Sequence, residues 1–199
     1  MKRVLDIAAA AIGLLLLAPL IGAVALMIKL DSPGAVFFKQ KRIGKDFRPF
    51  WIYKFRTMSE GAPAALPLTI GADPRITRVG NFLRRSKIDE LPQLINILKG
   101  EMTLVGPRPE VPRYVEAFHH DYQEILTVPP GLTDLASLKY CDEARLLGQS
   151  GHPEEEYLQR VLPDKIRLGK EYIRRSSLLF DLNLIVKTVL KLIFPRSAT

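Results

Sequence analysis

Two adjacent carboxylates, Asp89 and Glu90, are the strongest candidates for chemistry in this sequence. They stand at the predicted start of a helix over residues 91–98, where free N–H groups and the positive end of the helix dipole bind phosphate well. The segment before them supplies five basic residues: Arg75, Arg78, Arg84, Arg85 and Lys87. Arginine side chains match phosphate oxygens with forked donors. The pattern therefore predicts a phosphate site that holds ionised carboxylates.

Ionised carboxylates in such a site have two chemical uses. They can bind Mg²⁺, which prefers oxygen ligands and often bridges to substrate phosphates, and an Asp can attack phosphorus to form an aspartyl-phosphate ester. A structural interpretation stays open, because Asp and Glu are common capping residues at helix starts. Adjacent helical positions also point about 100° apart, so Asp89 and Glu90 are not expected to share one task as a paired acid and base.

Three further basic residues are candidate anion contacts. Arg108 lies between two prolines, which limit backbone freedom and hold its side chain in place. Lys54 and Arg56 alternate with aromatic residues on a predicted strand. Each has a structural alternative, a buried arginine for Arg108 and a solvated strand face for Lys54 and Arg56. The three histidines show no metal-ligand spacing, and the glycines match no P-loop or dinucleotide fingerprint.

The elements that must position these groups follow from the hydrophobic pattern. Residues 35–40 and 47–58 are predicted strands, joined by a hairpin turn at 43–46. Residues 59–72, rich in Gly, Pro and Ala, are typical of a loop. Predicted helices span residues 81–85, 91–98, 111–126, 153–162, 164–175 and 178–194. We expect an α+β fold that is mostly helical, with one small β-hairpin.

The N-terminal apolar run, residues 7–28, has 22 residues without a charge. As a straight helix it would be about 33 Å long, close to the ~30 Å of a bilayer core. A cleaved signal peptide, a spanning helix and a bent, re-entrant helix are the alternatives. Pro19 has no N–H, so the helix can kink there, and basic residues flank both ends, which marks both as cytoplasmic. We expect a re-entrant membrane helix over residues 1–30 and a cytoplasmic, membrane-associated catalytic domain over residues 31–199.

Composition and charge limit the class of protein. The chain has 199 residues, 47% of them hydrophobic, which excludes a wholly disordered chain, and its single long apolar run excludes a multi-span transporter. A lone cysteine excludes an internal disulfide. The net charge of +8 is concentrated in residues 1–113, with 18 basic and 9 acidic residues, and such a field attracts phosphates. Residues 178–194 form either an interfacial amphipathic helix or a core-packing one.

Several segments together resemble the monotopic phosphoglycosyl transferase family, the bacterial sugar transferases. The matching segments are residues 2–6 with the proline-broken apolar run, residues 38–44, residues 53–58, residues 89–96 (Asp-Glu-Leu-Pro-Gln-Leu-Ile-Asn) and residues 100–109, which end in Gly-Pro-Arg-Pro. The resemblance covers residues 1–135, and the last two segments are long and specific.

The resemblance implies a reaction, in which a phospho-sugar moves from a UDP-sugar to polyprenyl (undecaprenyl) phosphate, UMP leaves, and a membrane-linked glycan is started. It implies Mg²⁺ at Asp89 and Glu90, with Asp89 as the nucleophile on the β-phosphate and Glu90 as metal ligand or in proton handling. It suggests four phosphate or nucleotide contacts: Lys54, Arg56, Arg85 and Arg108. It also implies the re-entrant helix, the cytoplasmic face of the bacterial inner membrane and no nucleic-acid partner, and it suggests a homodimer.

The sequence departs from the family pattern at three single positions and over residues 139–143, which replace the family's usual continuation. Ala18 stands where the family often has Ser before the membrane-helix proline, Asp134 stands where it commonly has Gly, and Ser137 where it has Gln. These departures put the identity of the sugar in question more than the reaction. Two alternatives stay open: a non-catalytic membrane protein that binds anionic lipid or nucleic acid through its basic half, and an enzyme that uses a different nucleotide donor or a hydrolytic reaction.

Overall fold

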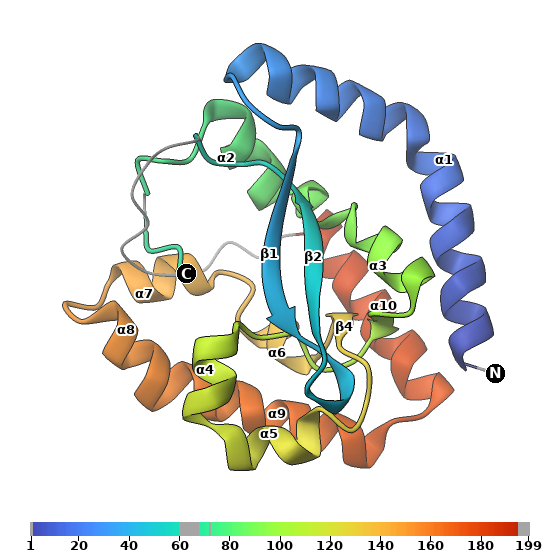
Figure 1. Ribbon diagram of the computed structural model, residues 1–199, viewed down its shortest axis with the longest axis vertical. Coiled ribbons are helices and arrows are strands. Elements are labelled where there is room, and N and C mark those ends of the chain that lie inside the picture. The colour runs from blue at the N-terminus through green and yellow to red at the C-terminus, as the bar shows by residue number, and fades with distance from the viewer. Residues whose placement is uncertain (1, 60–67, 72, 195–199) are drawn as a thin grey trace.

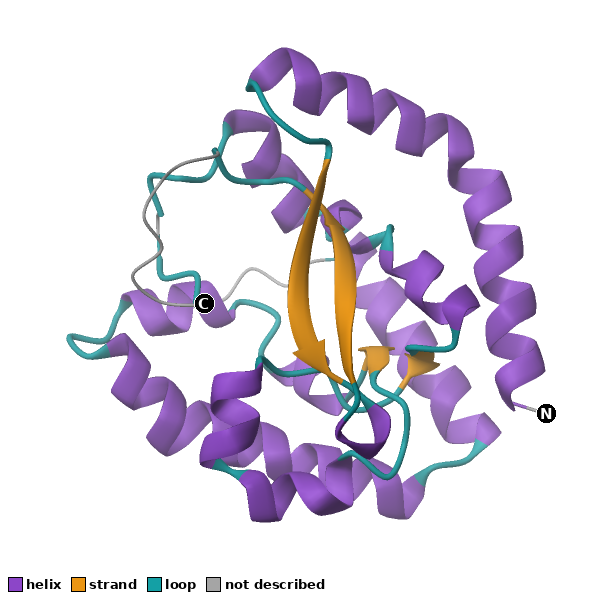
Figure 2. Ribbon diagram, in the orientation of Figure 1, coloured by secondary structure: helices purple, strands orange, loops and turns teal. Residues whose placement is uncertain are grey.

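The computed structural model describes residues 2–59, 68–71 and 73–194, so most of the loop predicted at 59–72 lies outside the described residues. Helices surround a long two-stranded hairpin, and a second pair of strands is much shorter (Figure 2). The helices of four or more residues are α1 (Lys2–Asp31), α2 (Arg78–Arg85), α3 (Gln93–Lys99), α4 (Pro112–Ala117), α5 (His119–Ile125), α6 (Leu135–Lys139), α7 (Glu143–Gly148), α8 (Pro153–Glu156), the π-helical η3 (Tyr157–Val161), α9 (Leu162–Arg175) and α10 (Leu178–Ile193). The expectation of a mostly helical α+β fold is confirmed.

The N-terminal helix α1 is continuous, contains Pro19 and arcs around one side of the molecule (Figure 1). It is long and apolar enough to cross a membrane. A narrow stripe of the helix is buried: Ala10 packs in a cluster with Phe50 and Ile97, and Val24 in a cluster with Leu83. Most of its other large apolar side chains are exposed. The helix is thus seated along one stripe and presents the rest of its apolar surface outward.

The predicted hairpin is present. Strand β1 (Phe37–Ile43) pairs antiparallel with β2 (Pro49–Phe55), with Phe38 opposite Lys54 and Arg42 opposite Phe50. The turn between the strands is longer than predicted, because it includes a 3-10 turn, η1 (Lys45–Phe47). The alternation along β2 buries Phe50 and Ile52 against α1 and α3 and leaves Lys54 on the same face, farther along the strand.

A parallel strand pair was missing from the sequence prediction. Strand β3 (Thr103–Val105) pairs with β4 (Gly131–Thr133), with Thr103 opposite Gly131. Each strand has three residues, too short for a periodic signal, and their partners lie far apart in sequence. This pair holds the Gly-Pro-Arg-Pro loop, because the Gly131 amide donates to the Pro107 carbonyl at 2.9 Å.

A Gly131→Ala substitution is expected to destabilise the protein. A Cβ at this position would lie 2.1 Å from the nitrogen of Gly106 and 2.3 Å from its oxygen, and backbone atoms cannot yield cheaply. We expect a loss of about 3 kcal/mol of unfolding free energy, at the upper end for overpacking. Gly151→Ala is the matched control, since a Cβ there meets nothing within 4 Å. Equal thermal midpoints of the two variants would contradict the prediction.

Two predicted helix boundaries are wrong. The predicted helix over residues 111–126 is divided at Phe118 into α4 and α5. The predicted break between residues 162 and 164 is absent, because η3 joins α8 to α9 in one helical run. The π turn shifts the hydrogen-bond ladder just before Pro163, which then occupies the first turn of α9, where a missing N–H is tolerated. This run carries the largest core cluster, which includes Tyr157 and Leu162.

Candidate functional site

A large cleft of about 2130 Å³ opens beside the hairpin and is lined by residues from β1, β2, α2, the Gly-Pro-Arg-Pro loop and the segment from β4 to α7. All six residues predicted from the sequence as site residues line it: Lys54, Arg56, Arg85, Asp89, Glu90 and Arg108. The fold therefore brings together groups that are up to 54 positions apart in the chain, from residue 54 to residue 108.

Asp89 and Glu90 lie in a short 3-10 turn, η2 (Ile88–Glu90), and not at the start of an α-helix as predicted. The preceding Lys87 has a φ of 57°, in the left-handed region, so the chain turns sharply before the two carboxylates. The next helix, α3, begins only at Gln93, and neither η2 nor α3 has a side-chain cap. The structural interpretation of Asp89 and Glu90 as helix caps is therefore wrong.

Glu90 is held between two cations. Arg108 donates from Nη1 to Glu90 Oε2 at 3.1 Å and from Nη2 to Oε1, and Lys54 Nζ donates to Oε1 at 3.0 Å. Burial works to raise the pKa of Glu90, but Arg108 and Lys54 together bring it well below the ordinary value. Glu90 is thus an anion at neutral pH, and it holds the guanidinium of Arg108 and the ammonium group of Lys54 at one point of the cleft.

Asp89 has the opposite environment. Its side chain is buried, and within the described residues no group donates a hydrogen bond to its Oδ1. Burial raises the pKa of Asp89, and the negative charge of Glu90 adds to the rise, while Lys54 opposes it. A poorly solvated carboxylate without donors is a better nucleophile than one held in an ion pair. The two neighbouring carboxylates therefore have different environments: Glu90 lies between two cations, and Asp89 is buried with an oxygen to which no described group donates.

Burial also lowers the pKa of Lys54, against the attraction of Glu90. Burial also works to lower the pKa of Arg108, but the negative charge of Glu90 outweighs it, and the pKa lies above the ordinary value for arginine. The arginine therefore remains charged at every accessible pH, while the lysine loses its proton more readily than an exposed lysine does. Both heads face the cleft beside the carboxylates, where a phosphate would meet them.

The other two predicted contacts are placed differently. Arg56 is buried and donates to the Ser32 carbonyl at 2.7 Å and to the Pro33 carbonyl, so its guanidinium closes the C-terminal end of α1. Arg85 lies in the last turn of α2 and is exposed. Both line the cleft, but neither has an ion pair with Asp89 or Glu90 among the described residues. Their role in binding phosphate stays a prediction.

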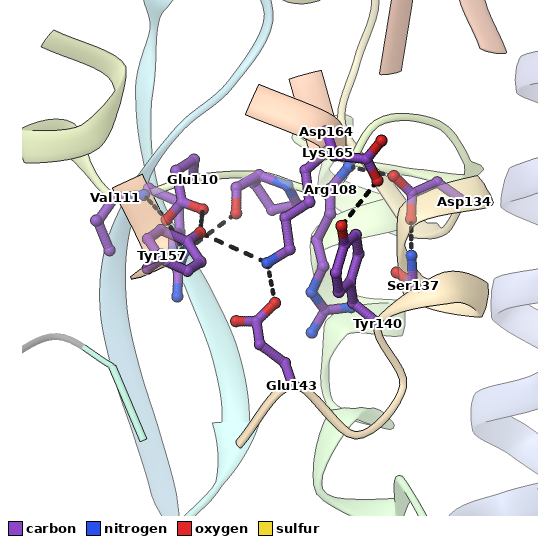
Figure 3. A network of polar contacts seen from close by, with 12 residues as sticks. Arg108, Glu110, Val111, Asp134, Ser137, Tyr140, Glu143, Tyr157, Asp164 and Lys165 are labelled. Atoms are coloured by element: carbon purple, nitrogen blue, oxygen red, sulfur yellow. Dashed lines mark hydrogen bonds and ion pairs between the residues drawn. The ribbon is translucent and has the colours of Figure 1, made fainter. Parts of the chain in front are cut away.

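One side of the cleft is formed by a network of polar side chains that the sequence analysis did not predict, and we call it the polar wall (Figure 3). Tyr157, almost fully buried, donates its hydroxyl to Glu110 Oε2 at 2.6 Å, and Arg42 donates to Glu110 Oε1 at 3.0 Å. Lys165 forms an ion pair with Glu143 and lies 4.9 Å from the centre of the Tyr157 ring. These residues come from four distant segments, so no local spacing could have indicated them.

The residues present fit a particular kind of magnesium site. Asp89 offers an unpartnered carboxylate oxygen, whereas both oxygens of Glu90 already face cations. No group of three or more His, Cys, Asp or Glu side chains in the described residues could enclose a metal. Mg²⁺ commonly takes one or two carboxylates and completes its octahedron with substrate phosphates and water. The donor set suits that arrangement and not a closed protein cage.

Comparison with known proteins gives a consistent assignment. The model of the family described as "Bacterial sugar transferase" matches residues 1–195. The chain is 42% identical to the UDP-glucose:undecaprenyl-phosphate glucose-1-phosphate transferase of Caulobacter vibrioides, over 99% of this chain and 71% of that protein. It is 39% identical to the Escherichia coli protein of the same name, over 96% of this chain and 40% of that protein.

A third relative differs in its sugar. The chain is 38% identical to the UDP-N-acetylgalactosamine-undecaprenyl-phosphate N-acetylgalactosaminephosphotransferase of Aeromonas hydrophila, over 94% of this chain and 42% of that protein. The chain thus spans about two fifths of the length of the Escherichia coli and Aeromonas relatives. The match of the family model over nearly its whole length shows that this chain belongs to the bacterial sugar transferase family.

Proposed function

We propose that this chain transfers a sugar 1-phosphate from a UDP-sugar to undecaprenyl phosphate and releases UMP. The observation that carries the proposal is the difference between the two carboxylates: Asp89 is buried, with an Oδ1 to which no described residue donates, and the neighbouring Glu90 holds Arg108 and Lys54. Relatives named for this reaction with glucose and with N-acetylgalactosamine support the reaction class and leave the sugar open. The polyprenyl acceptor is taken from the same names.

The reaction proceeds in two displacements at one phosphorus. A carboxylate oxygen of Asp89 attacks the β-phosphorus of the UDP-sugar, the bond from that phosphorus to the bridging oxygen breaks, and UMP leaves with the electron pair. Asp89 then carries the sugar phosphate as an acyl phosphate. A phosphate oxygen of undecaprenyl phosphate attacks the same phosphorus and releases the Asp89 carboxylate. The product is an undecaprenyl diphosphate sugar.

The side chains around Asp89 neutralise and orient the phosphates. Arg108 and Lys54 face the cleft with their positive charges fixed, so they are preorganised for the charge that develops on the transferring phosphoryl group. The low pKa of Glu90 makes it an anchor for these cations and not a proton carrier. Mg²⁺ would be held by the free oxygen of Asp89, with Glu90 nearby, and would add positive charge at the diphosphate.

The test is UMP release from a panel of UDP-sugars by protein held in nanodiscs, with Mg²⁺ and undecaprenyl phosphate. Release from one sugar, dependent on the acceptor and abolished by EDTA, is the expected result. UMP release at the same rate with and without acceptor would indicate hydrolysis. Salt-sensitive binding to anionic vesicles with no release from any UDP-sugar would favour the non-catalytic alternative.

Turnover is expected to follow a bell-shaped pH profile. Asp89 must be ionised to attack, and since its pKa is raised, kcat/KM for the donor should fall on the acid side with a midpoint above the ordinary value of 3.8. Lys54 must be protonated, and its lowered pKa puts the alkaline limb below 10.5. In Lys54→Arg the alkaline limb should disappear, because arginine stays protonated. An unchanged alkaline limb in that variant would refute the assignment to Lys54.

We also propose that α1 enters and leaves the membrane on the same face. Both of its ends are tied to one body: Lys2 Nζ donates to Asp181 Oδ2 at 2.6 Å, and Asp31 Oδ2 accepts from the Val79 amide at 3.2 Å. A straight helix of 30 residues would separate its ends by about 45 Å. Near the middle of the arc, Leu15 and Leu16 are 76% and 73% exposed, so this part would face the hydrocarbon.

Labelling of single cysteines tests this topology. In a Cys141→Ser background, cysteines at Val4 and Ala35 are both expected to react with a membrane-impermeant reagent only from the cytoplasmic side. A cysteine at Leu16 should be protected from both sides. Reaction of the Val4 cysteine from the opposite side would show a full crossing. The exposed apolar side chains of α10, such as Leu179 and Leu182, support a second, interfacial contact on that same cytoplasmic face.

A further inference from the structure

The backbone of the Gly-Pro-Arg-Pro loop has few hydrogen-bond donors. Pro107 and Pro109 have no N–H, so Arg108 supplies the single backbone donor between Gly106 and Glu110. That donor does not reach another backbone group. It donates to a side chain, Asp134 Oδ2, at 3.2 Å (Figure 3). The backbone amide of Arg108 is therefore held by one carboxylate, while the carbonyls on either side, of Pro107 and Pro109, accept from the Gly131 amide and from Arg42.

Asp134 is built into this position. It is 2% exposed, and its other oxygen accepts the Ser137 amide at 2.7 Å, which caps α6. One carboxylate thus satisfies two backbone donors on two segments. The strand that precedes it is paired with β3, and the Thr133 carbonyl accepts the Gly106 amide at 3.0 Å. A glycine at position 134 could accept neither of the two side-chain bonds.

Its charge also acts on the site. Asp134 lines the same cleft as Arg108 and Glu90. Burial lowers the pKa of the Arg108 guanidinium, but the negative charges of Glu90 and, to a smaller extent, Asp134 raise it above the ordinary value. Arg108 is thus held at both ends by carboxylates, at its backbone by Asp134 and at its guanidinium by Glu90. A shift of about 1 Å in such a group is enough to reduce catalysis strongly.

We infer that Asp134 is a positioning residue for transfer: it fixes the backbone of Arg108 so that the guanidinium meets the donor phosphates at Asp89. The inference rests on the proposed function, and it concerns a residue outside the Asp89–Glu90 pair. The helix cap alone does not account for the geometry, because capping uses only Oδ1, while Oδ2 reaches across to the loop.

Asp134→Ser separates the two roles. Serine is a good N-cap, so α6 keeps its cap, but the single short hydroxyl cannot also serve Arg108, and the loss of that one bond should lower the thermal midpoint by about 3–6 °C. We expect hydrogen exchange at the Arg108 amide to become at least about tenfold faster, and kcat/KM for the donor to fall about tenfold, the usual effect of losing a hydrogen bond to a charged group.

A double-mutant cycle distinguishes positioning from a general structural effect. If Asp134 acts through Arg108, Asp134→Ser should change kcat/KM by less than twofold in an Arg108→Ala background, whereas independent effects would multiply. Unchanged exchange at the Arg108 amide, or a full tenfold loss in the Arg108→Ala background, would overturn the inference. Failure of the proposed function is separate, because wild-type protein would then release no UMP at all.

Discussion

An Asp89→Asn variant is expected to release UMP at least about a thousandfold more slowly than the wild type, with no covalent sugar phosphate on the protein. The amide is neutral and cannot form the acyl phosphate. The substitution keeps the shape of the side chain, and among the described residues Asp89 Oδ1 has no hydrogen bond to lose, so the fold should persist. The measurement is single-turnover UMP release with a donor carrying a labelled β-phosphate, followed by a count of label on the denatured protein.

Asp142→Asn is the matched control. Asp142 lines the same cleft, but its side chain is 63% exposed and it has no contact with Glu90. Its loss should leave UMP release within about twofold of the wild type. Wild-type turnover in Asp89→Asn, or stable label on that variant, would remove Asp89 from the nucleophile's role and leave the reaction class standing on the UDP-sugar panel alone.

A Glu90→Gln variant is expected to lose about 3 kcal/mol of unfolding free energy as well as most of its turnover. Removing one member of a buried ion pair leaves its partners uncompensated, and here two cations, Arg108 and Lys54, would lose the same carboxylate. The estimate stays at the low end of the range because the Arg108 side chain is 32% exposed and partly solvated. For a chain of this size the thermal midpoint should fall by about 6–12 °C.

Glu156→Gln measures what an exposed ion pair contributes by comparison. Glu156 accepts from Arg160 at 2.8 Å across one helical turn, and the Arg160 side chain is 71% exposed. Such a pair contributes well under 1 kcal/mol, so the midpoint should move by about 2 °C or less. Similar shifts in the two variants would show that Glu90 is not the electrostatic anchor of the cleft, even if turnover is lost.

The parts of the fold that could be predicted are those set by local pattern. The length and apolarity of α1, the alternation of β2 and the presence of a helix at α10 all follow from residues close together in the chain. The acidic pair was found for the same reason, since Asp89 and Glu90 are adjacent and follow a basic segment. Its direct neighbours Lys54 and Arg108 were also named, although only a family pattern linked them to it.

What could not be predicted depends on contacts between distant segments. The β3–β4 pair, the polar wall around Tyr157 and the link from Asp134 to Arg108 each join parts of the chain that carry no shared signal. Arg56 shows the same limit from the other side. Arg56 follows Lys54 by two positions, so the alternation in the sequence predicts the same environment for both side chains. In the structure, however, Arg56 lies against carbonyl oxygens at the end of α1, because that helix ends beside it.

The bond from Lys2 to Asp181 has a consequence for how the protein is made. Its two ends are 179 positions apart in the chain. At a synthesis rate of about 5–20 residues per second, roughly 10–35 s separate the translation of Lys2 from that of its partner. During that interval α1 is already apolar enough to enter lipid, but the ammonium group of Lys2 has neither Asp181 nor Tyr172 to bind. The final docking of α1 must therefore wait until Asp181 has been translated.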